Sequence, residues 1–132
     1  MNPVFLSLED VLELHEDQIN RYGGSHGTRD MGLLLSAVEM PRASFGDEFL
    51  HTNLYEMASA YLFHLVQNHP FIDGNKRVGL AACIAFLGLN NIKLVAADVD
   101  NLTNMVLDVA QGKLGKAAIA KFLKKNSQGD HD

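Results

Sequence analysis

Hydrophobic residues recur every three or four positions along most of the chain, a spacing that predicts helices. The first predicted helix starts after Ser7, where Asp10 stands three residues on in a capping-box arrangement, and stops at the glycine pair 23–24. A second is predicted over residues 30–40, because Pro41 cannot continue it. Both helices are of ordinary length for a globular domain.

The helices expected at the centre of the fold lie in the second half of the chain. A third helix starts at Leu54, and residues 75–89 form a fourth that is apolar nearly all round, which indicates burial on most sides. The sequence predicts a short extended piece over 92–96, followed by two helices over 101–111 and 114–125. Alternation of period two is almost absent. We therefore predict an all-α fold of about six helices, forming a single domain over residues 1–126 with a disordered tail over 127–132.

Composition excludes several classes of protein. The 132 residues, 47% hydrophobic and 20% charged, fit one globular domain. The single cysteine, Cys83, excludes an intrachain disulfide and a cysteine-based zinc site, and is consistent with a reducing cytoplasm. A net charge of −5 argues against direct nucleic-acid binding, and the lysines near the C-terminus are interpreted as a solvated helix face. The longest apolar run, 78–89, is too short for a membrane span, so we expect a cytoplasmic protein without a membrane partner.

Candidate chemistry is concentrated in residues 69–77, at the junction between two predicted helices. The backbone N–H groups at a helix start favour an anion, and the cationic side chains of Lys76 and Arg77 add to this preference. Asp73 would repel a bare phosphate, so its presence predicts a bridging divalent cation such as Mg²⁺. His69 is a candidate base for an attacking hydroxyl.

Each of these features also has a simpler interpretation. Residues 73–75 alone are most often a turn, 75–77 a solvated helix start, and His69 a helix cap. Their occurrence together in one loop on a buried helix favours a catalytic site. The other histidines predict no site: His15 lies on an apolar stripe as a core or boundary residue, and His64 and His69 fall on different helical faces. The remaining ones, His26, His51 and His131, lack a chemical context.

The loop from His69 to Arg77 (HPFIDGNKR) resembles the signature of the Fic/Doc family, His-x-Phe-x-(Asp or Glu)-Gly-Asn-Gly-Arg-x-x-Arg. Segments 21–24, 27–30 and 41–46 resemble the flanks of its death-on-curing (Doc) branch. The resemblance implies a Fic-type helical bundle with the signature loop between two central helices. It also implies transfer of a phosphate-containing group from ATP, with Mg²⁺, to a protein hydroxyl. The implied roles are His69 as general base, Asp73 as metal ligand, and Gly74, Asn75, Lys76 and Arg77 as phosphate-binding residues.

Two positions depart from the pattern of the AMP-transferring members. Lys76 replaces the second glycine, and Leu80 stands where those members have a second arginine. The Asn-Lys-Arg form is that of the Doc branch, which implies a toxin kinase that transfers the γ-phosphate of ATP to elongation factor Tu. Transfer of AMP and a non-enzymatic antitoxin-binding module remain alternatives.

Inhibition is expected from a separate partner. The family's inhibitory motif places Ser or Thr four residues before a Glu that Gly or Asn follows; here Thr52 and Glu56 have the spacing, but Met57 follows. Glu56 is interpreted as part of the polar face of the third helix. The resemblance therefore implies a small antitoxin as inhibitor, and a protein target that docks on linker 41–53, where Phe45 is the candidate contact residue.

Overall fold

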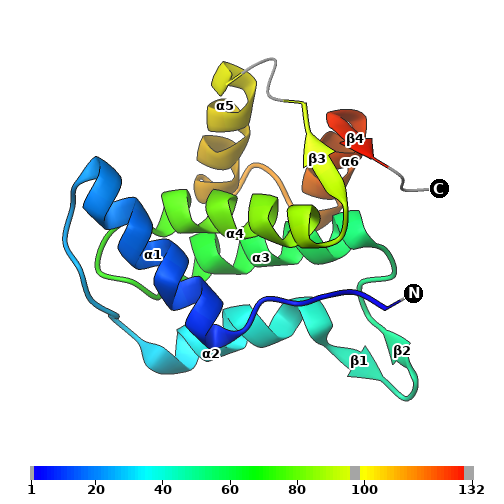
Figure 1. The fold of residues 1–132 in the computed structure, drawn as a ribbon, viewed down its shortest axis with the longest axis horizontal. Helices are drawn as coiled ribbons and strands as arrows, with labels where there is room; N and C mark the ends of the chain where they lie inside the picture. Colours follow the sequence, from blue (N-terminus) through cyan, green and yellow to red (C-terminus); the bar gives the residue numbers. More distant parts are fainter. Residues whose placement is uncertain (1, 96–98, 130–132) are drawn as a thin grey trace.

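The computed structural model describes residues 2–95 and 99–129, and shows six α-helices in this part of the chain (Figure 1). The elements, in chain order, are α1 (Leu8–Tyr22), α2 (Met31–Glu39), the 3₁₀ turn η1 (Met40–Arg42), β1 (Ser44–Phe45), β2 (Glu48–Phe49), α3 (Leu54–Asn68), α4 (Asn75–Leu89), β3 (Ile92–Leu94), α5 (Val99–Ala110), α6 (Lys116–Lys125) and β4 (Ser127–Gly129). The prediction of an all-α fold with about six helices is confirmed.

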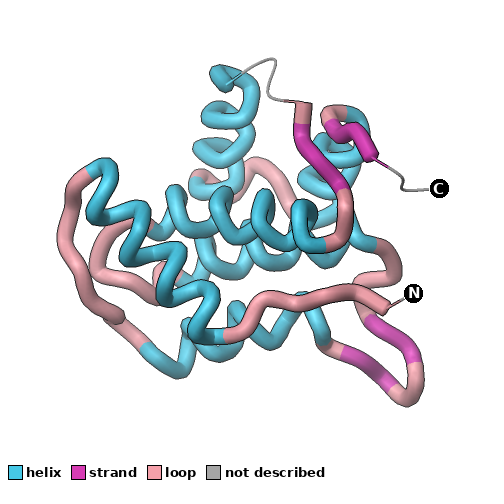
Figure 2. The backbone as a smooth tube through the Cα atoms, in the orientation of Figure 1, coloured by secondary structure: helices cyan, strands magenta, loops and turns pink. Residues whose placement is uncertain are grey.

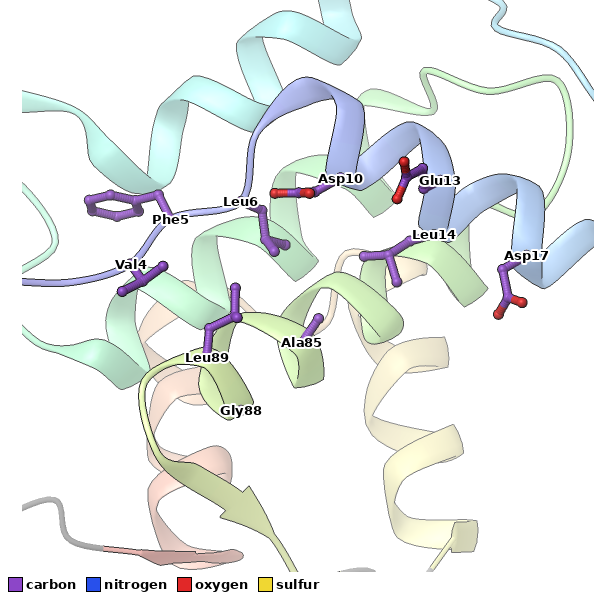
Figure 3. Close-up of a pocket in the computed structure, with 10 residues that line it drawn as sticks. All are labelled: Val4, Phe5, Leu6, Asp10, Glu13, Leu14, Asp17, Ala85, Gly88 and Leu89. Atoms are coloured by element: carbon purple, nitrogen blue, oxygen red, sulfur yellow. The ribbon is translucent and has the colours of Figure 1, made fainter.

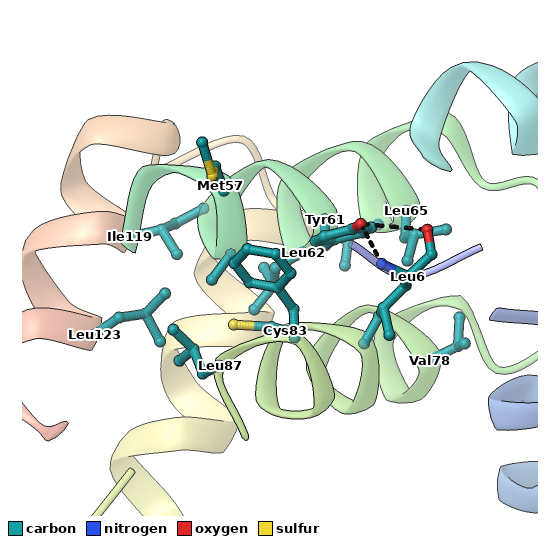
Figure 4. Packing of buried hydrophobic residues seen from close by; sticks show 14 of the residues in the cluster. Leu6, Met57, Tyr61, Leu62, Leu65, Val78, Cys83, Leu87, Ile119 and Leu123 are labelled. Carbon is teal, nitrogen blue, oxygen red and sulfur yellow. Dashed lines mark hydrogen bonds between the residues drawn. The ribbon is translucent and has the colours of Figure 1, made fainter. Parts of the chain in front are cut away.

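Helices α3 and α4 form the centre of the molecule, as the apolar pattern of 75–89 predicts (Figure 1). Figure 4 shows side chains of α3 facing those of α4, with Ile119 and Leu123 of α6 beside them. Gly79 permits the close approach of the two helices, because a Cβ there would lie 2.8 Å from Val66 Cγ2 and 3.3 Å from Leu62 O. The loop between α3 and α4 is therefore anchored at both ends in the core.

Helix α1 begins at the predicted capping box. The Ser7 hydroxyl accepts a hydrogen bond from Asp10 N at 3.1 Å, and Asp10 Oδ2 accepts one from Ser7 N at 2.9 Å. The preceding residue is tied to the core, since Leu6 N donates to the Tyr61 hydroxyl at 2.9 Å (Figure 4). These contacts set the start of α1 against α3, and the helix then crosses α4.

Two short antiparallel strand pairs lie outside the helical core (Figure 2). The first, β1–β2, is a hairpin within the 41–53 linker that the sequence did not predict, because two-residue strands are too short to show alternation. The second pairs β3, which confirms the extended piece over 92–94, with β4. The sequence predicts a disordered tail over 127–132; residues 127–129 form β4, while residues 96 and 130–132 lie outside the described range. None of the helices described here is long and apolar enough to cross a membrane.

Candidate functional site

The signature loop leaves α3 through a left-handed residue, His69, with φ 52° and ψ 51°. Arg29 caps the end of this helix: its Nε donates to His69 O at 2.7 Å and its NH2 to Asn68 O at 3.0 Å. Both carbonyls belong to the last turn, where intrahelical partners are missing. The side chain of His69 is exposed and lines a cavity of about 160 Å³ formed by the loop. Arg29 therefore supports the backbone that carries the candidate base.

The start of α4 is open to an anion. Its N-cap is Gly74, in the left-handed region at φ 78°, and no side chain in the described part of the protein caps the helix. Residues 75–77 follow within the first turn, where backbone N–H groups have no intrahelical acceptor. Asp73 to Arg77 and Ile72 line the same cavity as His69. The structure thus brings together all the residues that the sequence analysis assigned to the site.

Asp73 is held as a carboxylate by backbone amides. Its Oδ1 accepts from Gly74 N at 2.8 Å and its Oδ2 from Ser25 N at 3.1 Å, while Arg77 NH2 lies 3.9 Å from Oδ1. The bonds from Ser25 and Gly74, followed by the Arg77 charge, lower the pKa of Asp73 below its ordinary value. Gly24 is needed beside it, since a Cβ there would lie 2.6 Å from Oδ2.

The single carboxylate of Asp73 fits Mg²⁺, which needs few protein ligands, and does not fit a metal that needs three or more protein side chains. The side chain is 47% exposed, and its ionised oxygens are hard ligands. Among the described residues, no group of three or more His, Cys, Asp or Glu side chains could hold a metal. Mg²⁺ commonly binds one or two protein carboxylates and takes its other ligands from water and substrate phosphates. A magnesium–nucleotide complex is therefore the kind of ligand that this carboxylate suits.

Two predicted phosphate-binding side chains are engaged elsewhere. Asn75 is 4% exposed; its Oδ1 accepts from Phe71 N at 2.9 Å and its Nδ2 donates to Phe71 O at 3.0 Å. Arg77 NH1 donates to Gly23 O at 2.8 Å and to Gln18 O at 3.3 Å, which ties α4 to the end of α1. The contribution of Asn75 to phosphate binding is thus reduced to its backbone N–H. Arg77 keeps its NH2 on the side of Asp73.

Segment 24–30 braces the loop, a role that sequence reasoning missed. Gly27 O accepts from Ile72 N at 3.0 Å, and Pro70 O accepts from the backbone N–H groups of Arg29 and Asp30 at 2.7 and 3.0 Å. Glycines 23, 24 and 27 all have positive φ, and this glycine spacing was the available signal. The family resemblance marked the segment without assigning it a contact.

His15 was predicted to be a core or boundary residue, and its burial confirms this, at 4% exposed. Its environment was not predicted. Its ring stacks on Phe71 at 3.8 Å between centroids and 5° between planes, and its Nε2 donates to Asp73 O at 2.7 Å. Burial lowers the pKa of His15, so the neutral ring predominates at neutral pH.

The predicted solvated face on α6 is wrong at Lys116. This side chain is partly buried, and its Nζ donates to the Nε2 atoms of His51 and His64, each at 3.1 Å. Burial, followed by the Lys116 charge, lowers the pKa of His64 to about 4, and the same two causes lower the pKa of His51. The cluster joins α6 to α3 and to the loop before it, and serves packing. The exposed His26 has no assigned role, and His131 lies outside the described residues.

We expect stability to fall as pH drops from about 6.5 to about 4. In this window the unfolded chain binds a proton that folded His64 does not, because the folded pKa is depressed to about 4. The loss attributable to His64 should be on the order of 1–2 kcal/mol after allowance for its partial exposure. Urea unfolding at several pH values measures it. His64→Gln should flatten the profile, and an unchanged slope in this variant would contradict the assignment.

Comparison with known proteins agrees with this geometry. The Fic/DOC family model matches residues 5–87. The chain is 29% identical over 120 residues to "Protein kinase doc" of Escherichia phage P1, covering 91% of this chain and 93% of that protein. It is 37% identical over 107 residues to "Toxin Doc" of Mycolicibacterium smegmatis, covering 80% of each. With the signature loop between α3 and α4 and the matched region spanning most of the bundle, this chain belongs to the Fic/Doc family.

Proposed function

We propose that this chain is a Doc-type toxin that transfers the γ-phosphate of ATP to a hydroxyl of a protein target. The observation that carries the proposal is the position of Asp73, whose carboxylate is oriented by two backbone amides beside the uncapped start of α4. The name "Protein kinase doc", borne by a relative that aligns over nearly the whole chain, supports phosphate transfer. Elongation factor Tu is the proposed target on the family resemblance, and on the same ground we propose that the protein acts in the cytoplasm.

The residues divide the chemistry between them. His69 takes the proton of the attacking hydroxyl as the new O–P bond forms and the bond to the β-phosphate oxygen breaks, so that ADP leaves. The backbone N–H groups of 75–77 and the exposed Lys76 bind the phosphates. Asp73 would hold Mg²⁺, which when bound supplies neutralisation of the phosphate charge. The Arg29 cap keeps the backbone at His69 in place during the reaction.

Two residues favour γ-phosphate transfer over AMP transfer. Lys76 adds a side chain at the turn that would cradle the inner phosphates of a nucleotide in the AMP-transferring orientation. Leu80 is partly buried and packs against the core, so α4 offers no second arginine there for the outer phosphates. A nucleotide bound the other way round, with its γ-phosphate at the turn, needs neither free space for inner phosphates at position 76 nor an arginine at position 80. In that orientation the terminal phosphate lies nearest His69.

Labelled ATP tests the proposal. The protein is incubated with elongation factor Tu, Mg²⁺ and ATP carrying radiolabel at either the α- or the γ-phosphate. Label transferred only from the γ position supports the kinase, whereas label from the α position would establish AMP transfer. Absence of both, together with no binding of Mg-ATP by calorimetry, would indicate a non-enzymatic binding module.

The name "Toxin Doc", borne by one of the two relatives, also supports an inhibitory protein partner, an antitoxin, for this chain. We propose that a basic amphipathic helix of that partner docks in the groove between α1, the N-terminal segment and α4 (Figure 3). The groove has a volume of about 760 Å³ and an apolar floor that includes Leu14, Ala85 and Leu89. Asp10, Glu13 and Asp17 of α1 form an acidic edge, which matches lysine and arginine side chains flanking an apolar stripe.

Synthetic helices test the groove directly. A peptide with leucines on one face and lysines beside them should bind the protein in fluorescence anisotropy, and its glutamate counterpart should bind more weakly. Glu13→Lys should weaken the lysine peptide about tenfold, whereas Glu9→Lys, on the same helix outside the groove, should not. Equal binding of both peptides, or equal effects of both variants, would contradict the docking site.

A further inference from the structure

The ring of His15 belongs to α1, yet it contacts the signature loop 58 residues away in sequence. It lies flat against Phe71 and donates a hydrogen bond from Nε2 to Asp73 O at 2.7 Å. A carbonyl oxygen only accepts, so the proton of the neutral ring is on Nε2. None of the roles assigned above to the signature residues uses this contact.

The hydrogen bond from His15 fixes the orientation of the peptide between Asp73 and Gly74. In a planar trans peptide the C=O and the following N–H point in opposite directions. With the carbonyl held on His15, the Gly74 N–H points to the other side, where it donates to Asp73 Oδ1 at 2.8 Å. A flip of this peptide would remove that bond and turn the carbonyl oxygen toward the carboxylate. Gly74, at φ 78° and without a Cβ, does little by itself to prevent such a flip.

The ring is itself held in place. Phe71 is 1% exposed, and its backbone is fixed by the side chain of Asn75. A Cβ on Gly74 would lie 3.1 Å from Ile19 Cδ1 and 3.6 Å from His15 Nε2, so α1 packs closely against the turn. His15 is therefore a rigid donor between an anchored aromatic ring and the carbonyl of the Asp73–Gly74 peptide.

We propose that His15 is a positioning residue that locks the Asp73–Gly74 peptide in one orientation. The lock sets the direction of the Asp73 carboxylate and of the first turn of α4, which starts at this peptide. Its effect on Mg²⁺ rests on the proposed function, since it requires that Asp73 hold the cation. The lock itself is a property of the ligand-free fold.

Two substitutions test the aromatic ring of His15 and its N–H donor separately. His15→Phe keeps an aromatic ring against Phe71 but removes the donor, whereas His15→Gln restores an N–H donor and removes the ring. Val11→Ala is the matched control, because it trims a fully buried side chain of the same helix. Amide hydrogen exchange at Gly74 reports the lock without any ligand, and the Mg²⁺ concentration for half-maximal transfer reports its effect on Asp73.

We expect His15→Phe to accelerate Gly74 exchange and to raise the Mg²⁺ requirement, each about tenfold or more, with a smaller change in kcat at saturating Mg²⁺. His15→Gln should restore most of both values, and Val11→Ala should shift neither. Wild-type values in His15→Phe, or equal shifts in Val11→Ala, would overturn the proposal. A wild-type protein that binds no Mg-ATP would refute the proposed function while leaving the exchange test valid.

A spectroscopic test needs no variant. The ¹⁵N resonances of the His15 ring in the wild-type protein should show the proton on Nε2 at neutral pH. A ring protonated only on Nδ1 cannot donate to Asp73 O and would overturn the proposal.

Discussion

Replacing His69 by alanine is expected to reduce phosphate transfer by about 10²–10⁴-fold, the usual contribution of a positioned general base. The side chain is exposed, so its removal should leave the fold and its stability nearly unchanged. Binding of Mg-ATP should also persist, because Asp73 and the start of α4 are untouched. The measurement is transfer of γ-label to elongation factor Tu at saturating ATP, with calorimetry for the binding.

The control is His26→Ala, which removes another exposed histidine from the bracing segment 24–30. It should keep transfer near the wild-type rate. A His69→Ala protein that labels its target as fast as wild type would remove His69 from the mechanism. Loss of Mg-ATP binding in the same variant would instead assign His69 to nucleotide binding.

The second large effect is expected from Phe71→Ala, which should lower the free energy of unfolding by about 3–5 kcal/mol. Phe71 is 1% exposed and stacks on His15, so its removal leaves a cavity between α1 and the loop. Transfer should fall as well, because the ring fixes the path of the loop toward Asp73. Urea unfolding measures the stability change.

Phe45→Ala is the matched control for that measurement. It makes the same chemical change on a ring that is 85% exposed in the β1–β2 hairpin. Its stability should change by no more than about 0.5 kcal/mol. Similar losses for the two phenylalanines would contradict the anchoring role of Phe71.

The helices could be predicted because their signals are local. Ser7 and Asp10 form the capping box of α1, Asp30 and Asn53 cap α2 and α3, and the apolar run of 75–89 became the buried α4. Each signal involves residues within a few positions of one another. Of the strands, only the extended piece that became β3 was predicted, and its pairing with β4 was not. The two-residue strands β1 and β2 gave no signal, because they are too short to show alternation.

The role of Glu56 was also not specified by its position in the sequence. Its spacing from Thr52 matches the family's inhibitory motif, and the sequence interpretation placed it on a polar helix face. In the structure its carboxylate accepts from Thr52 N at 3.1 Å and from Asn53 Nδ2 at 2.9 Å, at the end of α3 away from the signature loop. There it holds the side chain of Asn53, the residue that caps the start of α3.

The sequence by itself determined which chemical groups this loop carries: a histidine, a carboxylate, a helix start and two cations. It also determined that two helices flank the loop, because periodicity and capping act over a few residues. Only the tertiary structure decided how those groups are held. Ser25 orients Asp73, Arg29 supports His69, and His15 contacts Asp73 O across 58 positions. Such partners are selected by the packing of α1 and segment 24–30 against the loop, and no local pattern specifies that packing.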